Sequence, residues 1–399
     1  MKPKDIKSSD IRGLKFFKPL QDLLDRLHLL YPNPNRSLHY DQYFCLLLLY
    51  YFNPILTSLR GMQVASTLER VQKELGVKSA ALGSLSEAAH VFDPEPLRQI
   101  FMELAKQACA ADAIARPEGL PKELSLIAFD GTLWSYLPRM APYFWENGPR
   151  TGPPPGFKAH LQFNILKGVP SSVDITAGYG DERRTLEKNL AANNLYIIDR
   201  GLCDFKLFQE IIDARSSFVA RGNDCLVART IKNFELTESA RQAGVYSDEL
   251  VQLGSEPHAG KLRQPLRVIR ARVALRPPHN LNPRRGSGDQ DQILDLLLIT
   301  DQLEMPAELI VQLYHYRWQV EIFFRWLKCT LGLKHFVSEC QNGFALQLYA
   351  ALIAGLLIVV WTGRKPTKRM LEMIQWYLSG WATLEEVLAA INKLKPARV

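Results

Sequence analysis

Four polar side chains are spaced so that a single helix would present them along one side. They are Tyr314, Arg317, Glu321 and Lys328. At about 100° per residue they share a stripe roughly 60° wide over about four turns. Pro306 suits the first turn of such a helix, and Gly332 suits a stop just past its end. A carboxylate beside a guanidinium, an ammonium and a phenol can ligate a metal ion while the cations hold a phosphate.

The same stripe has a simpler interpretation. An amphipathic helix with ion pairs between residues i and i+4, such as Arg317 and Glu321, needs no functional site. The adjoining flank is apolar and would anchor either kind of helix on a core. It consists of Leu313, Val320, Phe324, Leu327 and Leu331. The rest of the chain has to decide between the two interpretations.

Two apolar segments earlier in the chain end in an aspartate that is soon followed by glycine. Residues 124–129 lead into Asp130, and residues 195–198 lead into Asp199. Each segment predicts a buried strand that places an acid at the mouth of a sheet. Either motif alone is a common strand and turn, but two of them in one α/β domain are a much sharper signal.

The acids Asp130, Asp199 and Glu321 come from separate segments and can converge at one end of that sheet. Carboxylate oxygens without neighbouring His or Cys suit Mg²⁺ or Mn²⁺ rather than zinc. Two such ions about 4 Å apart would activate a water or a 3′-hydroxyl for an in-line phosphoryl displacement. The Arg and Lys of the helical stripe would then grip the scissile strand, and its Tyr would hydrogen-bond a phosphate or stack.

Composition limits the partners and the compartment. The 399 residues carry a net charge of +8, which favours a polyanion such as nucleic acid. The six cysteines include no Cys-X-X-Cys pair, which argues against zinc and fits free thiols in a reducing compartment. No signal peptide is expected, since residues 1–18 are basic and interrupted. The apolar run 348–361 is short for a membrane span and predicts a buried core helix, so we expect a cytoplasmic protein without a membrane partner.

The predicted elements divide the chain into five parts. These are a helical N-terminal domain for DNA binding (1–118), the first part of an α/β core (119–221), a β-rich insertion (222–290), the second part of the core (291–362) and a helical basic C-terminal tail (363–399). Two short helical pieces around glycines within residues 61–90 suit a helix-turn-helix, and the alternative is a helical subdomain without groove contact. The tail serves either DNA contact or dimerisation.

A basic segment lies within the predicted insertion. Residues 257–288 hold eight Lys or Arg and no Asp or Glu. If residues 266–275 form a strand, alternation places Arg270, Arg272 and Arg276 on one face. A face of one sign favours contact with DNA phosphates, whereas a basic edge strand that discourages aggregation is the alternative.

The helical stripe and the two aspartate motifs together resemble a known family. The four stripe residues reproduce the Tyr-(2)-Arg-(3)-Glu-(6)-Lys signature of the insertion-sequence-four family of DDE transposases. Asp130 in Phe-Asp-Gly-Thr matches the first catalytic Asp of that family, and Asp199 in Ile-Ile-Asp-Arg-Gly matches the second. The resemblance covers residues 120–340 well and the helical N-terminus more loosely.

The resemblance implies an α/β fold with an RNase H-like core that the β-rich insertion interrupts. It implies a nucleoid-associated enzyme that assembles as a homodimer on the terminal inverted repeats of double-stranded DNA, cleaves there and joins the ends to target DNA with two Mg²⁺ or Mn²⁺ ions. The catalytic and metal-ligating residues implied are Asp130, Asp199 and Glu321. The DNA-contacting residues implied are Tyr314, Arg317 and Lys328. Trp318 lies where members that excise through a DNA hairpin can have a Trp.

Two rival functions come from other classes. A catalytically inactive DNA-binding protein derived from a transposase would bind without turnover, and a two-metal nuclease would cut without joining. No Walker-type glycine-rich loop is present, so ATP use is not expected. Elsewhere, His160 is interpreted as a structural strand residue. Asp174 and Asp181 are interpreted as surface or capping groups, although Asp181 is near enough to the core to be a rival acid.

Overall fold

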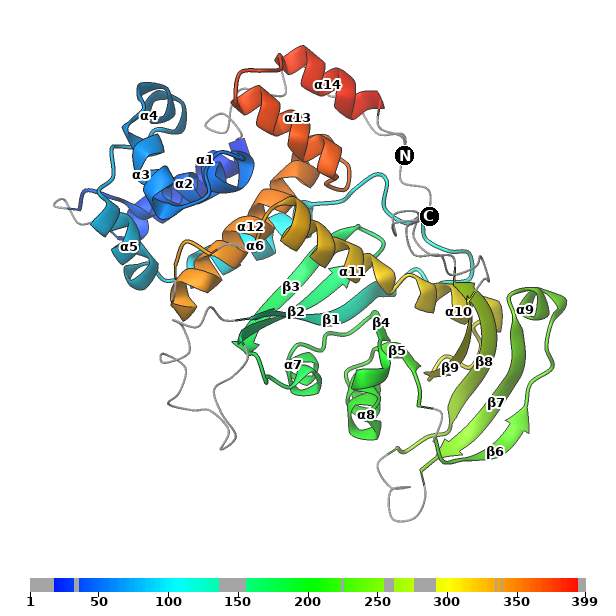
Figure 1. Ribbon diagram of the computed structural model, residues 1–399. Coiled ribbons are helices and arrows are strands. Elements are labelled where there is room, and N and C mark those ends of the chain that lie inside the picture. Colours follow the sequence, from blue (N-terminus) through cyan, green and yellow to red (C-terminus); the bar gives the residue numbers. More distant parts are fainter. Residues whose placement is uncertain are drawn as a thin grey trace.

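A single large sheet with helices on both faces forms the centre of the molecule (Figure 1). The computed structural model describes residues 18–31, 36–135, 156–223, 226–254, 262–275, 292–333, 336–338 and 340–393. The predicted α/β class is confirmed, since nine strands lie in the order β3-β2-β1-β4-β5-β9-β8-β7-β6. Their bounds are β1 (Ser125–Ser135), β2 (Gly156–Asn164), β3 (Val169–Ala177), β4 (Asn194–Ile198), β5 (Ser217–Arg221), β6 (Ala228–Asn233), β7 (Val245–Leu253), β8 (Leu266–Leu275) and β9 (Gln292–Thr300).

Strand direction divides the sheet into a core and an extension. The middle strands β1, β4 and β5 run parallel, and the other neighbours pair antiparallel. Strands β1, β2 and β3 form a meander at one end. At the other end β6, β7 and β8 continue the same sheet, and β9 returns beside β5 through the register pair Val219–Thr300. The strand predicted over residues 266–275 is β8, so the predicted insertion shares a hydrogen-bonded sheet with the core.

In the described part of the chain, six helices precede the sheet. They are α1 (Lys18–Leu30), α2 (Tyr40–Phe52), α3 (Leu59–Thr67), α4 (Glu69–Leu75), α5 (Leu82–Val91) and α6 (Glu95–Gln107). The prediction of two helical pieces within residues 61–90 is wrong, because the region holds three helices. The Ser58 hydroxyl accepts a hydrogen bond from the Gly61 amide and starts α3, and an extended Leu68 separates α3 from α4. Gly76, at φ +67°, ends α4.

The helix α12 (Gln341–Thr362) lies at the centre of the helical layer (Figure 1). It is long and apolar enough to cross a membrane, but 94% of its most apolar stretch is buried inside the protein. It shares one apolar core with α2, α6 and the sheet. The prediction of a buried core helix over this run is therefore confirmed. Two further helices follow, α13 (Lys368–Leu378) and α14 (Leu384–Lys393).

The two faces of the sheet carry different helices (Figure 1). On one face α7 (Glu182–Lys188) and α8 (Phe205–Asp213) pack against Ile127 and Phe129 of β1. On the other face α10 (Ala307–His315), α11 (Trp318–Arg325) and α12 pack with Leu126 and Ala128. A short helix, α9 (Glu238–Gln242), lies in the extension beside β7. Even-numbered side chains of β1 therefore turn toward α10 and α11.

The helix predicted between Pro306 and Gly332 is interrupted. It consists of α10, α11 and a π-helical turn, η6 (Trp326–Thr330). Between α10 and α11 the hydrogen bonds tighten to an i→i−3 pattern, as from the Arg317 amide to the Tyr314 carbonyl at 3.0 Å. Both predicted ends hold, because Pro306 directly precedes α10 and Gly332 has φ +87°. The predicted apolar flank is buried, with Val320 fully covered.

A buried ion pair anchors the extension to the loop before α10. Arg267 on β8 donates from Nη2 and Nε to the two carboxylate oxygens of Asp248 on β7, at 2.6 and 2.8 Å. Its Nη1 donates to the carbonyl oxygens of Gln302, Leu303 and Met305. Both side chains of the pair are at most 6% exposed. Arg267 thus fixes the chain just before the helices that carry the predicted site residues.

This anchor predicts a large difference between two arginines of β8. Arg267→Met leaves Asp248 buried without its partner and should lower the free energy of unfolding by about 3 to 5 kcal/mol. The matched control is Arg272→Met, because Arg272 pairs with Asp295 at 3.6 Å in an exposed position. That change should cost less than about 1 kcal/mol. Urea unfolding of both variants measures the difference, and equal losses would contradict the anchoring role.

Candidate active site

Asp130 and Asp199 lie at equivalent places on neighbouring parallel strands. The register pairs of β1 and β4 end with Ala128 and Ile197, and each aspartate lies two residues farther on. Ala128 and Ile197 belong to the core that includes α10, α11 and α12, so alternation turns both aspartates toward that face. The prediction that the first strand ends at its aspartate is wrong, because β1 continues along β2 as far as Ser135. Its pairing with β4 stops before the aspartate.

Arg317 connects the acid on α11 to the strand acids. Its Nη2 lies 2.6 Å from a carboxylate oxygen of Glu321, one helical turn later. The Arg317 side chain is 9% exposed, and its buried Nε has no hydrogen-bond partner among the described residues. Burial lowers the pKa of Arg317, but neighbouring acidic groups, led by Asp199, outweigh burial and raise the pKa above its ordinary value. The carboxylates that act on it are Asp199, Glu321 and Asp130.

Tyr314, near the end of α10, is a second link to the strand acids. Its hydroxyl donates to Oδ1 of Asp199 at 3.1 Å. Burial, and then the charge of Asp199, raises the pKa of Tyr314 above its ordinary value, so the hydroxyl stays protonated. Asp199 is therefore oriented by a residue that lies seven positions before Glu321 on the same helical segment.

The pKa of Asp130 is unusually high for an aspartate. Burial raises its pKa to about 6, although the charge of Arg317 and a hydrogen bond from the Gly131 amide both lower it. The charges of Glu321 and Glu182 add to the rise. Ionising this carboxyl group is costly in the metal-free protein. A cation bound beside it would stabilise the charged form and lower its pKa.

This pKa predicts the stability of an isosteric variant. Without added metal, Asp130→Asn should be more stable than the parent protein by about 3 kcal/mol at pH 7.5, because the parent must bury a charge. The folded pKa lies above the ordinary 3.8, so this cost is fully present above about pH 6 and shrinks as the pH falls toward 4. Thermal unfolding in EDTA across this range measures it. The exposed Asp213→Asn is the control, and a pH-independent advantage for Asp130→Asn would contradict the interpretation.

Lys328 is held at the far end of β1. Its Nζ donates to the Leu133 carbonyl at 2.7 Å and lies 4.3 Å from the centre of the Trp134 ring. The Trp134 indole nitrogen donates to the Leu333 carbonyl at 2.7 Å, which ties β1 to the segment after η6. Lys328 thus faces the same strand as Asp130 but lies farther along it. Trp318, at the start of α11, is 37% exposed.

Arg270 and Arg272 lie away from the acids. Both share a face of β8 with Leu266 and Val268, which belong to the core that includes α7 and α8. The helix α10 packs with the opposite face, to which Asp130 and Asp199 also turn. The structure therefore does not bring these two arginines into the candidate site, and Arg276 lies outside the described residues.

The basic face of β8 is not of one sign. Arg272 lies 3.6 Å from Asp295 of β9 and stacks over the Tyr246 ring at 5.0 Å. The Tyr246 hydroxyl donates to Asp295 at 2.7 Å. The expectation of a face with charges of one sign is wrong. The pattern of β8 alone shows only positive charges there, whereas the neighbouring strand β9 supplies a negative charge. Contact of this face with DNA stays a prediction.

The donor set suits a hard divalent cation. The acids that face α10 and α11 offer only carboxylate oxygens, the ligands that Mg²⁺ and Mn²⁺ prefer. In the described part of the chain, no three His, Cys, Asp or Glu side chains are gathered closely enough to hold an ion together. The positive charge of Arg317 lies among the acids instead. In this arrangement the guanidinium, and not an ion, balances the charge of the acids.

Other acids and the histidine named from the sequence have structural roles. His160 is 1% exposed, its Nε2 lies 2.8 Å from the Thr176 hydroxyl, and burial lowers its pKa to about 4. It is therefore neutral at physiological pH. Asp181 caps α7 by accepting a hydrogen bond from the Arg183 amide at 2.9 Å, which confirms the capping interpretation. Asp174 accepts a hydrogen bond from the asparagine that ends α7.

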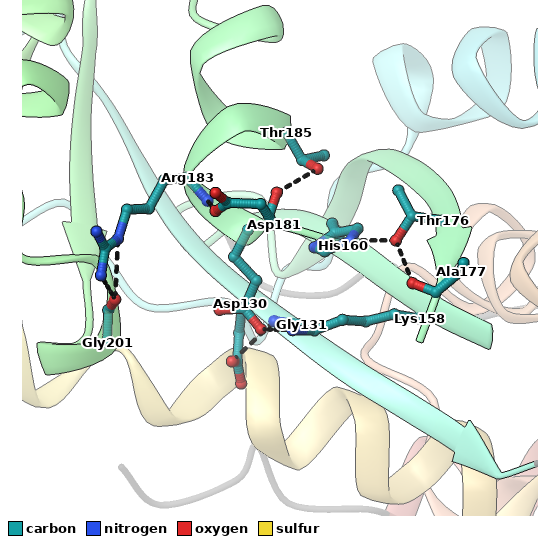
Figure 2. Close-up of polar contacts among 11 residues, drawn as sticks. Asp130, Gly131, Lys158, His160, Thr176, Ala177, Asp181, Arg183, Thr185 and Gly201 are labelled. Carbon is teal, nitrogen blue, oxygen red and sulfur yellow. Dashed lines mark hydrogen bonds and ion pairs between the residues drawn. The ribbon is translucent and has the colours of Figure 1, made fainter. Parts of the chain in front are cut away.

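Sequence reasoning missed a charged cluster beside the two aspartate motifs (Figure 2). Lys158 Nζ lies 2.5 Å from a carboxylate oxygen of Glu182, and this pair covers Gly131. Arg183 donates to the Gly201 carbonyl, close to the second aspartate. The only signal was a run of charged residues, 181–184, at the start of a predicted helix. That run gives no indication of which strands it contacts.

Comparisons with known proteins converge on one family. The family described as "Transposase DDE domain" matches residues 121–357. The chain is 29% identical over 205 residues to a protein named as a transposase, y4zB, of Sinorhizobium fredii, and 25% identical over 218 residues to the "Probable transposase for insertion sequence element IS5377" of Geobacillus stearothermophilus. These alignments cover 51% and 55% of the chain and 52% and 51% of those proteins, so the chain spans about half the length of these relatives.

Two further similarities extend over more of the chain. A protein named as a transposase for insertion sequence element IS4SA, from a Synechocystis species, is 22% identical over 303 residues, with 74% of this chain and 77% of that protein covered. Among solved structures, a piggyBac transposase synaptic complex with hairpin DNA aligns over 94% of this chain and 82% of that chain. The TM-score is 0.36 and the sequence identity is 11%.

Proposed function

This chain belongs to the family of DDE transposases, whose domain spans residues 121–357 of its 399 residues, and we propose that it cleaves DNA at the ends of an insertion sequence and joins those ends to target DNA. The resemblance to the insertion-sequence-four family is confirmed, since its relatives include one named for element IS4SA. The observation that carries the proposal is the placement of Arg317. It contacts Glu321 and lies within electrostatic reach of both strand aspartates.

The arrangement of the strands supports an RNase H-like core. Strands β3, β2 and β1 form an antiparallel meander, and β4 and β5 continue from β1 in parallel. The first acid lies on β1, the second follows β4, and the third lies on α11, which packs against β1 and β2. The β-rich insertion enters after β5 and returns at β9, between the second aspartate and the glutamate. We infer that this is the catalytic core of the family with an insertion of the predicted kind.

The three acids would hold the divalent ions. Asp130, Asp199 and Glu321 are the proposed ligands, and two such ions, when bound, activate the attacking hydroxyl and stabilise the leaving oxygen. Two of these acids are hydrogen-bonded to side chains of the helical segment in the metal-free protein. Tyr314 orients Asp199, and Arg317 holds Glu321. Mg²⁺ is the expected ion, with Mn²⁺ as the alternative.

Cations and an aromatic ring beside the acids would hold the DNA strand. Arg317 can form a bidentate contact with a phosphate once its charge is no longer required by the acids. Lys328 lies along β1 past Asp130 and would meet a phosphate farther along the strand. Trp318, at the start of α11, is partly exposed, and we propose that its indole stacks on a base. We propose that the Tyr314 hydroxyl donates a hydrogen bond to a DNA phosphate once DNA binding breaks its hydrogen bond to Asp199.

Several partner assignments complete the proposal. Double-stranded DNA carrying terminal inverted repeats is the proposed substrate, and the net charge of +8 supports a polyanionic partner. Residues 1–118 are the proposed DNA-binding region, and a homodimer assembled on two ends is the proposed active form. No membrane partner is proposed. The basic tail after α12 would add DNA contact or dimer contact.

A DNA cleavage assay tests the function. The protein is mixed with labelled DNA that carries the inverted repeats flanking its gene, with Mg²⁺ and a supercoiled target plasmid. Nicked ends together with joined products support the transposase. Binding without nicking would favour the inactive DNA-binding protein, and nicks without joined products would favour a nuclease. Either of these outcomes would replace the proposed function.

A further inference from the structure

We propose that the first turn of α7 is a clamp that sets the separation of Asp130 and Asp199, with Glu182 and Arg183 as positioning residues. The clamp consists of Lys158, Glu182 and Arg183, and the inference rests on the proposed function because it gives those aspartates a shared ion to hold. Glu182 acts on the strand that carries Asp130. Its chain neighbour Arg183 donates to the Gly201 carbonyl (Figure 2), and Gly201 lies in the turn that follows Asp199. One helical turn therefore contacts both segments.

One side of the clamp is the Glu182–Lys158 ion pair, which contacts the backbone beside Asp130. The ion pair with Lys158 measures 2.5 Å, and the two side chains are 21% and 26% exposed. A Cβ atom at Gly131 would lie 2.5 Å from the Glu182 carboxylate and 2.9 Å from Lys158 Cε, so the pair rests directly on this glycine. The Gly131 amide donates to Oδ1 of Asp130 at 2.8 Å. The pair thus fixes the peptide whose N–H orients the Asp130 carboxylate.

The other side of the clamp is Arg183, which hydrogen-bonds to the turn after Asp199. Its Nε and Nη2 donate to the Gly201 carbonyl at 3.3 and 3.2 Å. Its Nη1 lies 3.7 Å from Asp204, at the far side of the same turn. Gly201 belongs to the 3₁₀ turn η4 (Arg200–Leu202), which begins at the residue after Asp199. The guanidinium therefore fixes the backbone that presents the second aspartate.

The sheet alone does not fix the distance between these acids. Register pairing of β1 with β4 ends at Ala128 and Ile197, before either aspartate. Mg²⁺ requires near-ideal octahedral geometry, so the separation of its carboxylate ligands has to be set closely. The capped first turn of α7 bridges the two segments at the place where the strands cease to pair. Its charged side chains act through backbone contacts and do not themselves ligate.

Manganese binding to the DNA-free full chain tests the clamp, with free Mn²⁺ measured by electron paramagnetic resonance. Glu182→Gln and Arg183→Met should each weaken Mn²⁺ binding by about tenfold, the lower range for groups that orient metal ligands. Arg184→Met is the matched control, because the Arg184 side chain is 81% exposed in the same helical turn. It should bind Mn²⁺ as the parent protein does.

Two glycines give a second, independent comparison. Gly131→Ala has to displace the ion pair and should weaken Mn²⁺ binding, whereas Gly201→Ala meets open space and should leave it unchanged. The exchanged pair, Lys158→Glu with Glu182→Lys, should recover most of the affinity that either single change loses. A clamp role would be overturned if Glu182→Gln and Arg183→Met bound Mn²⁺ normally. It would also be overturned if the exchanged pair failed to recover affinity while unfolding at the parent temperature.

One further variant separates failure of the clamp from failure of the proposed function. Asp199→Ala removes a proposed ligand and should weaken Mn²⁺ binding more than any clamp variant. If Asp199→Ala binds Mn²⁺ like the parent protein, the proposed metal site is wrong, and the clamp loses its purpose with it. If only Asp199→Ala is impaired, the metal site holds and the clamp alone is rejected.

Discussion

Replacing Asp199 with alanine should abolish DNA cleavage while leaving binding of the element ends nearly unchanged. Asp130→Ala and Glu321→Ala should do the same. Groups that merely orient metal ligands typically contribute ten- to hundredfold, so loss of a ligand itself should lower the cleavage rate by more than about a hundredfold. DNA affinity is expected to change little because the proposed contacts to the phosphates come from cations and not from the acids. Single-turnover nicking and filter binding on the same DNA measure the two quantities.

The control for the acid series is an aspartate outside the site. Asp213→Ala alters an exposed carboxylate at the end of α8 that pairs with Arg263. It should cleave and bind like the parent protein. Retained cleavage in one of the three acid variants would remove that residue from the site. Loss of DNA binding together with cleavage would instead indicate that the acid supports the fold.

The second large effect concerns Arg317 in the absence of metal. Arg317→Ala should destabilise the metal-free protein by about 3 kcal/mol, because it leaves three acids near one another without the buried guanidinium. Mg²⁺ or Mn²⁺ should then restore stability to the variant more than it raises that of the parent. The ion would supply the charge that the side chain no longer provides. Thermal unfolding with EDTA and with increasing Mn²⁺ measures both effects.

Arg325→Ala is the matched control on the same helix. Arg325 is exposed at the end of α11, so its removal should change neither the metal-free stability nor the response to Mn²⁺. Equal Mn²⁺ responses in the parent, Arg317→Ala and Arg325→Ala would show that Arg317 does not neutralise the acids. The same Arg317→Ala protein should also cleave DNA poorly, since it lacks a phosphate contact.

The sequence predicted which residues form the helical stripe, but it did not predict that the helix carrying them is interrupted. Tyr314, Arg317, Glu321 and Lys328 all face β1, β4 or one another, as a single helix would require. The break after His315 was not foreseeable, because the i→i−3 turn there uses neither Gly nor Pro. The π-helical turn at residues 326–330 likewise cannot be recognised from the spacing of apolar residues. Leu327 is buried in this turn and would also be buried in a regular α-helix.

Features that depend on partners distant in the chain escaped prediction. The strand ending at Asp130 was misjudged because β2 keeps β1 extended to Ser135, and pairing with β2 is not a local property. The sequence of β8 alone predicts a purely basic face, whereas Asp295, which neutralises Arg272, lies on the neighbouring strand β9. Glu182 went unnoticed because its partner lies on β2, well before it in the chain. Local periodicity places residues on faces, but it does not show which charges meet there.

The placement of manganese in crystals of the protein with its end DNA tests the central claim most directly. Anomalous scattering at the manganese edge locates the ions without reference to the protein model. We expect manganese within coordination distance of carboxylate oxygens from Asp130, Asp199 and Glu321, with the Arg317 guanidinium turned to a DNA phosphate. Manganese bound elsewhere, or bound at this place without one of the three acids as ligand, would contradict the account.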